Sequence, residues 1–348
     1  MKKNWRHLLR LSPLLLLSVM LTGCGKKGVS ALIPMGEIAR EQAWLMLFSF
    51  CIMLVVVAVV VIIFIYVLVR FRARRGQEDV IPKQVEGHTV LEILWTVIPI
   101  ILLIILAVPT IAKTVSEENT HVGKNNKNVI QINVTANQYW WEFQYPDQKI
   151  TTAQDLVIPK GKTVILNLTS KDVIHAFWVP ALAGKIDANP GQTTKLKLEA
   201  DHEGTYRGRC AELCGSSHAL MYFNVKAVSD DEYNQWIKDM KTAMKNGPAA
   251  PTTDDAKKGE DLFSKNCMSC HAVGSKGGNI GPNLTDFADR ENVAGLLDHN
   301  KKNLEKWIKD PSAVKPGANM PSRGASGNLT DDQIKQIADY LFTLSVKQ

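Results

Sequence analysis

The chain has few cysteines, and their spacing argues against a disulfide framework. Its 348 residues include six, at positions 24, 51, 210, 214, 267 and 270. An exported domain could pair such residues in disulfides. Four of them, however, stand in two close pairs, and a histidine follows each pair within a few positions. This pattern favours metal or cofactor attachment over structural crosslinks.

Excess positive charge is also scarce. The formal net charge is +7, but four of the basic residues, Lys2, Lys3, Arg6 and Arg10, lie in an N-terminal targeting segment. Without these four charges the chain carries +3. Such a balance gives no case for nucleic-acid binding, so nucleic acid is excluded as a partner.

The N-terminus has the features of a bacterial export signal. "MKKNWRHLLR" is basic, "LSPLLLLSVML" is a short apolar run, and "LTGC" resembles a lipobox. This pattern predicts a lipoprotein signal peptide over 1–23 and lipid attachment at Cys24. The alternative is a chance cysteine behind an ordinary signal peptide.

Two apolar segments are long enough to cross a membrane. Residues 44–69 carry no charge, and residues 90–112 carry one acidic group. A bilayer needs about 20 apolar residues, so both are predicted transmembrane helices within an N-terminal segment 24–115. The basic run "RFRARR", residues 70–75, marks the cytoplasmic side. The N-terminus and the large C-terminal part are therefore expected on the outer face of a bacterial plasma membrane.

The remainder divides into a β-rich and a helical part. Short β-branched stretches separated by turn residues predict a small antiparallel barrel or sandwich over about 126–228, closed by a helix, within a domain 116–245. Residues 246–253, "NGPAAPTT", read as a linker. Residues 254–348 are helical in pattern and end with "TDDQIKQIADYLFTL", which begins with a capping box.

The stretch "CAELCGSSHALM", residues 210–221, gathers metal-type ligands. Cys210 and Cys214 are soft thiolates, and His218 and Met221 follow them. His175, in "DVIHAFWVP", offers a second imidazole. Thiolate, imidazole and thioether together suit copper. A disulfide between the cysteines, a zinc site without the methionine, and unrelated core residues are the alternatives.

This motif, the upstream histidine, the segment "QYWWEFQYP" and the two spans resemble subunit II of cytochrome c oxidase over residues 40–228. The resemblance implies a cupredoxin domain with a binuclear copper centre, CuA, in which two thiolates bridge the metals. Glu212 would lend its backbone carbonyl to copper and its side chain to a magnesium site shared with subunit I. The implied copper ligands are His175, Cys210, Glu212, Cys214, His218 and Met221.

The aromatic segment departs from that family in one respect. The family usually begins it with tryptophan, the position that accepts electrons from soluble cytochrome c. Here that position is Tyr139, followed by Trp140 and Trp141. The three are candidates for the point where electrons enter, and packing in the barrel core is the alternative for each.

The second cysteine pair matches the attachment motif of c-type haem. In "CMSCH", Cys267 and Cys270 would form thioethers and His271 would bind the iron. Met320, in "GANMPSRG", is the expected sixth ligand, as in the class I cytochromes c that this part resembles, and His299 is the competitor. Methionine ligation raises the haem potential, which suits a donor to copper.

Glu92 lies near the cytoplasmic start of the second span. An ionisable residue there is a functional candidate. In the resemblance, "LEILWTVIP" is the segment whose glutamate guards the entrance of a proton-uptake channel, and an interfacial side chain reaching for water is the alternative.

Together these features resemble subunit II of a caa3-type cytochrome c oxidase. The implied fold is a two-helix transmembrane hairpin, an all-β cupredoxin domain and an all-α class I cytochrome c domain. The implied partners are oxidase subunits I and III and an external donor, either a quinol–cytochrome c reductase or a small cytochrome c. A CuA-bearing subunit of a nitric oxide reductase and a free-standing membrane-anchored electron carrier are the alternatives.

Overall fold

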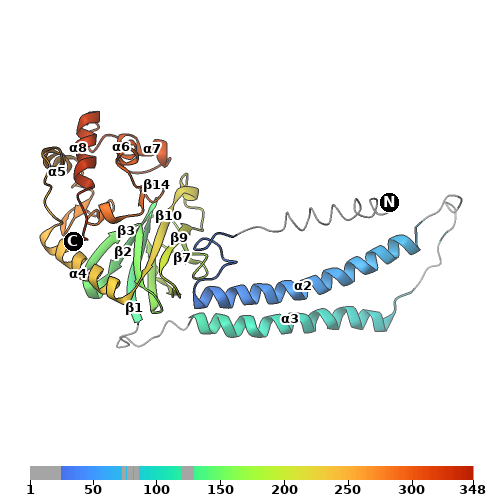
Figure 1. The fold of residues 1–348 in the computed structure, drawn as a ribbon. Helices are drawn as coiled ribbons and strands as arrows, with labels where there is room; N and C mark the ends of the chain where they lie inside the picture. The colour runs from blue at the N-terminus through green and yellow to red at the C-terminus, as the bar shows by residue number, and fades with distance from the viewer. Residues whose placement is uncertain (1–24, 73–75, 77–80, 82–85, 119–128, 348) are drawn as a thin grey trace, which may run out of the picture.

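A computed structural model describes residues 25–72, 76, 81, 86–118 and 129–347 of the chain. A long helical hairpin leads into a β-sandwich, and a group of shorter helices lies on the far side of that sandwich (Figure 1). The predicted signal peptide 1–23, Cys24 and residues 73–75 of the basic run lie outside the described residues.

The hairpin consists of α2 (Glu37–Arg70) and α3 (Thr89–Glu118). Both helices are long and apolar enough to cross a membrane. They extend beyond the predicted spans 44–69 and 90–112 because polar turns at their ends continue the helices. The large side chains along both helices are exposed, as expected of surfaces that face lipid.

The start of α2 is anchored on the β-sandwich. Met35 donates its backbone N–H to the carbonyl of Ala181 at 2.7 Å, and its own carbonyl accepts from Asp201 at 2.9 Å. Ile38 and Ala39 are buried against the sandwich. The hairpin and the sandwich are therefore joined by packing as well as by the chain.

Two five-stranded sheets form the sandwich. The first has the order β3-β2-β1-β5-β8, and the second has the order β4-β10-β9-β6-β7. The first comprises β1 (Val129–Asn137), β2 (Trp140–Tyr145), β3 (Ile150–Ala153), β5 (Thr163–Ser170) and β8 (Thr194–Leu198). The second comprises β4 (Asp155–Pro159), β6 (His175–Trp178), β7 (Ile186–Ala188), β9 (Gly204–Cys210) and β10 (Tyr222–Val228). Short 3-10 turns η1 (Pro146–Gln148) and η2 (His218–Leu220) interrupt the connections.

The pairing differs from the prediction in two places. β1 pairs with β5, and β4 with β10, in parallel, whereas the other paired strands are antiparallel. Alternating residues fill the space between the sheets, where Trp141, Phe177 and Phe223 are fully buried. The Phe177 and Phe223 ring centroids lie 4.5 Å apart. This aromatic centre stiffens the end of the sandwich that carries the metal-type ligands.

α4 (Asp230–Asn246) closes the sandwich. Ser229 and Glu232 form a capping box at its start. Its buried face carries Met240, and Trp236 packs on Tyr145 with ring centroids 5.1 Å apart. The predicted linker 246–253 lies between this helix and the next.

The C-terminal domain contains α5 (Asp254–Asn266), α6 (Lys301–Lys309), α7 (Pro311–Val314) and α8 (Asp331–Leu341). It also has η3 (Phe287–Asp289) and the two-residue strand pairs β11 (Ala272–Val273) with β12 (Lys276–Gly277), and β13 (Asn292–Val293) with β14 (Leu297–Asp298). α5 and α8 touch at Gly259, where an added Cβ would come within 1.9 Å of the Gln336 carbonyl. Thr330 and Gln333 form the predicted capping box of α8.

The C-terminal domain rests on the sandwich at the end remote from the membrane hairpin (Figure 1). Polar contacts fix it there. Arg207 of β9 donates to the side chain of Asn292 at 2.7 Å and to the carbonyl of Gly295 at 2.9 Å. Thr152 donates to Asp286 at 2.7 Å.

Candidate copper and haem sites

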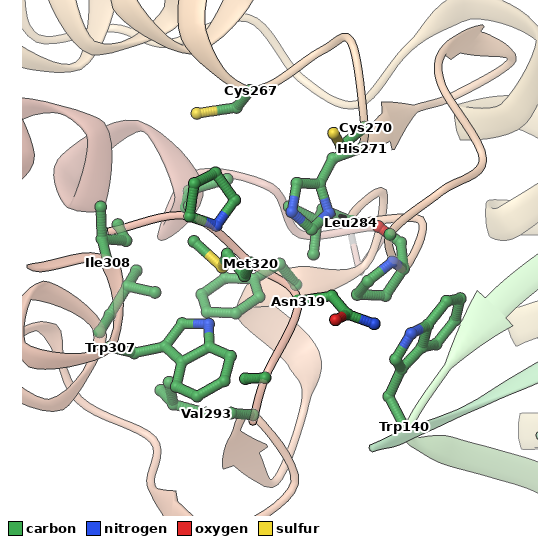
Figure 2. A pocket seen from close by; sticks show the side chains of 18 of the residues that line it. Trp140, Cys267, Cys270, His271, Leu284, Val293, Trp307, Ile308, Asn319 and Met320 are labelled. Atoms are coloured by element: carbon green, nitrogen blue, oxygen red, sulfur yellow. Dashed lines mark hydrogen bonds between the residues drawn. The ribbon is translucent and has the colours of Figure 1, made fainter. Parts of the chain in front are cut away.

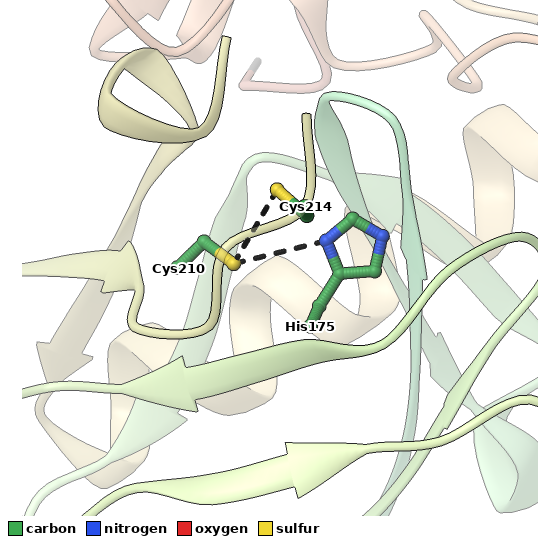
Figure 3. A group of neighbouring side chains, drawn as sticks. All are labelled: His175, Cys210 and Cys214. Carbon is green, nitrogen blue, oxygen red and sulfur yellow. Dashed lines mark hydrogen bonds between the residues drawn. The ribbon is translucent and has the colours of Figure 1, made fainter. Parts of the chain in front are cut away.

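The metal-type ligands predicted in the β domain converge at one end of the sandwich. β9 ends at Cys210, and the loop that follows carries Cys214 and His218 before β10 begins. β6, which pairs with β9, begins at His175 and brings the upstream histidine beside the loop. Figure 3 shows His175, Cys210 and Cys214 turned toward one another.

The distances suit shared metal coordination. The two Sγ atoms are 3.8 Å apart. Cys210 Sγ lies 3.7 Å from His175 Nδ1, and Cys214 Sγ lies 3.6 Å from His218 Nδ1. Met221 Sδ is 3.9 Å from Cys214 Sγ. One imidazole thus stands beside each sulfur, an arrangement suited to two ions that share both thiolates.

Glu212 presents its backbone to this cluster. Its carbonyl oxygen lies 3.3 Å from Cys210 Sγ. The predicted backbone ligand is therefore close to the other donors.

The contact between the two thiols shifts their pKa values in opposite directions. The Cys214 contact lowers the pKa of Cys210, and the same contact raises the pKa of Cys214. Burial disfavours the charged form of His175, but hydrogen bonds to Cys210 and Asp172 outweigh it and raise the pKa of this imidazole. Metal ions bind the thiolate form of cysteine. The lowered pKa of Cys210 therefore favours metal binding at this sulfur.

Asp172 also belongs to this cluster, although the sequence did not single it out. Its Oδ1 lies 2.8 Å from His175 Nε2, the ring nitrogen remote from the cysteine. Backbone N–H groups of Gln138 and Val173 also donate to this carboxylate. A carboxylate behind a metal-binding histidine fixes the ring and its tautomer. The available signal was its position three residues before His175.

The second predicted constellation lines a cavity in the C-terminal domain. Cys267, Cys270 and His271 stand on one side of it and Met320 on the other (Figure 2). The other lining residues are mainly apolar and include Phe263, Leu284, Phe287, Val293, Leu304, Trp307, Ile308 and Leu341. A flat apolar group with metal at its centre fits such a space.

His271 is held in a suitable orientation. Its Nδ1 lies 2.9 Å from the carbonyl oxygen of Pro282. Nδ1 would donate this bond, which leaves Nε2 as the free lone pair. Burial lowers the pKa of His271 and keeps the ring neutral, as a metal ligand must be. Gly281 lies so close beneath the ring that an added Cβ would be 2.7 Å from His271 Cε1.

His299, the competitor for the sixth position, does not line the cavity. Its ring packs between Phe287 and Phe342, with centroid distances of 5.2 and 4.7 Å. The side chain of Met320 reaches the cavity instead.

The three aromatic candidates occupy different surroundings. Tyr139 and Trp140 line the haem-type cavity from the β domain, and Trp140 lies near Asn319 in Figure 2. Trp141 points into the core, where its ring centroid is 6.0 Å from that of His175. The segment 139–141 therefore runs between the cavity and the copper-type cluster, which consists of His175, Cys210, Cys214, His218 and Met221.

Glu92 and Cys51, on the two membrane-type helices, lie far from both sites. Glu92 is exposed in the first turn of α3. Cys51 is exposed on α2.

Comparison with known proteins matches three family models. They are the transmembrane domain of cytochrome c oxidase subunit II over 35–112, its periplasmic domain over 148–228, and cytochrome c over 256–345. The chain is 49% identical over 358 residues to cytochrome c oxidase subunit 2 of Bacillus sp. PS3, covering 99% of this chain and 98% of that protein. This chain belongs to the cytochrome c oxidase subunit II family.

Other relatives are subunit 2 of a cytochrome c oxidase and of a quinol oxidase. Cytochrome c oxidase subunit 2 of Alkalihalophilus pseudofirmus is 44% identical over 352 residues, covering 99% of this chain and all of that protein. Quinol oxidase subunit 2 of Bacillus cereus is 37% identical over 262 residues, covering 75% of this chain and 87% of that protein. The chain is thus a caa3-type oxidase subunit with a fused cytochrome c domain. Its domains suit electron transfer to CuA, and the alternatives are not favoured.

Both cofactor types fit the residues present. The copper-type cluster offers soft thiolate, imidazole and thioether donors within 3.9 Å of their neighbours. The cavity offers free thiols at Cys267 and Cys270, an oriented imidazole and an opposing thioether.

Proposed function

We propose that this subunit carries electrons from a covalent haem c in its C-terminal domain to a binuclear CuA in its β domain and on to subunit I. The observation that carries the proposal is the shared cavity, because residues of both domains line it and lead to the copper-type cluster. When bound, the haem and the copper pair exchange single electrons. In subunit I, oxygen would be reduced to water with proton pumping.

In the copper site the protein holds, orients and excludes water. Cys210 and Cys214 would bridge two copper ions, His175 and His218 would each bind one, and Met221 would bind weakly. His175, Cys210, Cys214 and Met221 are all buried. A buried site with fixed ligands changes geometry little between oxidation states, which favours fast electron transfer.

In the haem site the protein would supply covalent attachment and iron ligands. Cys267 and Cys270 would bind the haem covalently, and His271 and Met320 would bind the iron. Tyr139 and Trp140 at the cavity, and Trp141 beside His175, would carry electrons toward copper.

The remaining assignments follow from the family resemblance, from the lipobox-like N-terminus and from the basic run after the first span. Glu92 would guard a proton-uptake entrance, and the Glu212 side chain would bind magnesium at the contact with subunit I. Cys24 would carry lipid, and both soluble domains would lie on the outer face of a bacterial plasma membrane. Subunit III would complete the complex, and a quinol–cytochrome c reductase or a small cytochrome c would deliver electrons.

Cofactor analysis of the purified full chain tests the proposal. We expect two coppers and one covalent haem per chain, with an electron paramagnetic resonance (EPR) pattern from one unpaired electron shared by two copper nuclei. A single-copper pattern, zinc, or haem removed by mild extraction would contradict it.

A further inference from the structure

The cytochrome segment 315–318, which leads to Met320, is inserted between two loops of the β domain. Lys315, at its start, has a side chain only 2% exposed. Its Nζ donates to the backbone carbonyl of Tyr139 at 2.9 Å. The segment is therefore tied to the loop that lines the haem-type cavity from the β domain.

A second hydrogen bond joins the same segment to residues 211–221, the loop between β9 and β10 that we call the copper ligand loop. Ser217 is fully buried, and its hydroxyl donates to the carbonyl of Pro316 at 2.8 Å. Ser217 directly precedes the copper ligand candidate His218. Gly317 adopts φ +78°, and an added Cβ would lie 3.3 Å from the Tyr139 hydroxyl. Glycine therefore permits both the turn and the close approach.

The two loops of the β domain are themselves connected. Gln138 donates from Nε2 to the carbonyl of Cys214 at 2.6 Å. One continuous route runs from Met320 to Lys315, across to Tyr139 and Gln138, and into Cys214. The other crosses from Pro316 to Ser217 and continues into His218.

Packing alone does not explain a lysine at position 315. Among the described residues no carboxylate pairs with it, and burial together with the nearby charge of Arg207 lowers the pKa of Lys315 to about 7. A buried cation without a carboxylate beside it costs stability. An apolar side chain would cost less, so the lysine is better explained by the contact that it makes.

We propose that Lys315 and Ser217 are positioning residues that hold the haem-bearing loop against the copper ligand loop and so set the rate of electron transfer from haem c to CuA. The inference rests on the proposed function, because it needs both cofactors. It assigns to the two side chains a role in geometry rather than in metal binding.

The test uses the full chain with both cofactors bound. A flash-activated photoreductant delivers one electron to haem c, and the transfer to CuA is followed by absorption. Lys315→Met and Ser217→Ala are compared with Lys335→Met, a change of an exposed lysine on α8. EPR relaxation of CuA by ferric haem reports their separation, and thermal unfolding reports stability.

We expect Lys315→Met to slow the transfer by about tenfold and to weaken the relaxation effect, because small displacements of reacting groups cost large factors in rate. Its Tm should be unchanged or higher, while Ser217→Ala should slow the transfer severalfold. Both variants should keep the haem spectrum and the CuA spectrum of Lys335→Met, and the potentials of both cofactors are measured in each variant.

Rates equal to the control in both variants would overturn the inference. So would a slower rate that a changed potential or a lowered Tm accounts for. Absence of haem or copper from the unmodified chain would instead contradict the proposed function.

Discussion

The copper loop and the haem cavity assemble their ligands in different ways. Most copper ligand candidates come from residues 210–221, and strands β6 and β9 hold that loop and His175 in place. The iron ligand candidates, His271 and Met320, come from separate loops on opposite sides of a cavity. A rigid sheet can present a metal site before the metal arrives, whereas the haem itself is part of the core that it fills.

The cysteines of the two sites also differ in the pKa of their thiols. Contact with Cys214 lowers the pKa of Cys210, so a thiolate forms there readily. Burial raises the pKa of Cys267 to about 12, so its thiol stays protonated. The lowered pKa of Cys210 favours metal binding, whereas the apolar surroundings of Cys267 keep its thiol neutral.

Removal of a bridging thiolate should affect one site strongly and leave the other intact, and this is the largest effect that we expect. We expect Cys210→Ser to abolish the shared-electron copper signal while the haem stays bound, because the haem ligand candidates all lie in the C-terminal domain. Copper content, EPR and haem absorption measure the outcome. Cys51→Ser, on the membrane helix, is the matched control, and a copper signal that survives in Cys210→Ser would refute the bridging role.

Replacement of the iron ligand tests the haem side. Met320→Leu should keep the covalent haem but lose the methionine–iron absorption band and lower the haem potential. His299→Ala should keep both and cost about 1 kcal/mol of stability, since it removes packing between two aromatic rings. If His299→Ala changed the band and Met320→Leu did not, the ligand assignment would be reversed.

The carboxylate behind the copper ligand should have a smaller effect. Asp172→Asn should weaken copper binding by about 10- to 100-fold, because the ring of His175 loses the partner that orients it. A competitive copper titration measures the change. Asp147→Asn, an exposed change in η1, should leave the affinity as it was. Equal affinities in the two variants would argue against the orienting role.

The smallest expected effect is a pH dependence of domain contact. The pKa of Lys315 is about 7 when buried and 10.5 when free, so the charged form favours separation of the domains. The penalty is full below pH 7 and shrinks as pH rises toward 10.5. Between these limits contact should tighten as the pH rises.

Hydrogen exchange of amides at the domain contact measures this dependence. Protection at the contact should rise with pH after correction for the intrinsic exchange rate. Lys315→Met should remove the dependence. A dependence of the opposite sign, or one that persists in the variant, would contradict the assignment to Lys315.

Much of the copper site was predictable because its spacing is local. Cys210, Cys214, His218 and Met221 lie in one loop whose composition already indicates copper, and only His175 comes from elsewhere. The family resemblance extended this to Glu212, and the motif CMSCH indicated the haem attachment. The structure brings the copper ligand candidates within 3.9 Å of a neighbouring donor and places Cys267, Cys270, His271 and Met320 around one cavity.

The unpredicted features depend on contacts between distant segments. Lys315 and Tyr139 are 176 positions apart, and nothing in either sequence neighbourhood indicates the bond between them. The parallel pairings of β1 with β5 and β4 with β10 have the same cause, because alternating hydrophobic residues indicate a strand but not its neighbour. Asp172 stands in a polar turn, where an acidic residue is ordinary.

The most direct test of the account is the concentration dependence of electron transfer in the unmodified full chain. After a flash reduces haem c, its reoxidation and the reduction of CuA should share one first-order rate that does not change with protein concentration. Such a result would establish transfer within one chain. A rate that rises in proportion to concentration, or haem reoxidation without CuA reduction, would contradict the central claim.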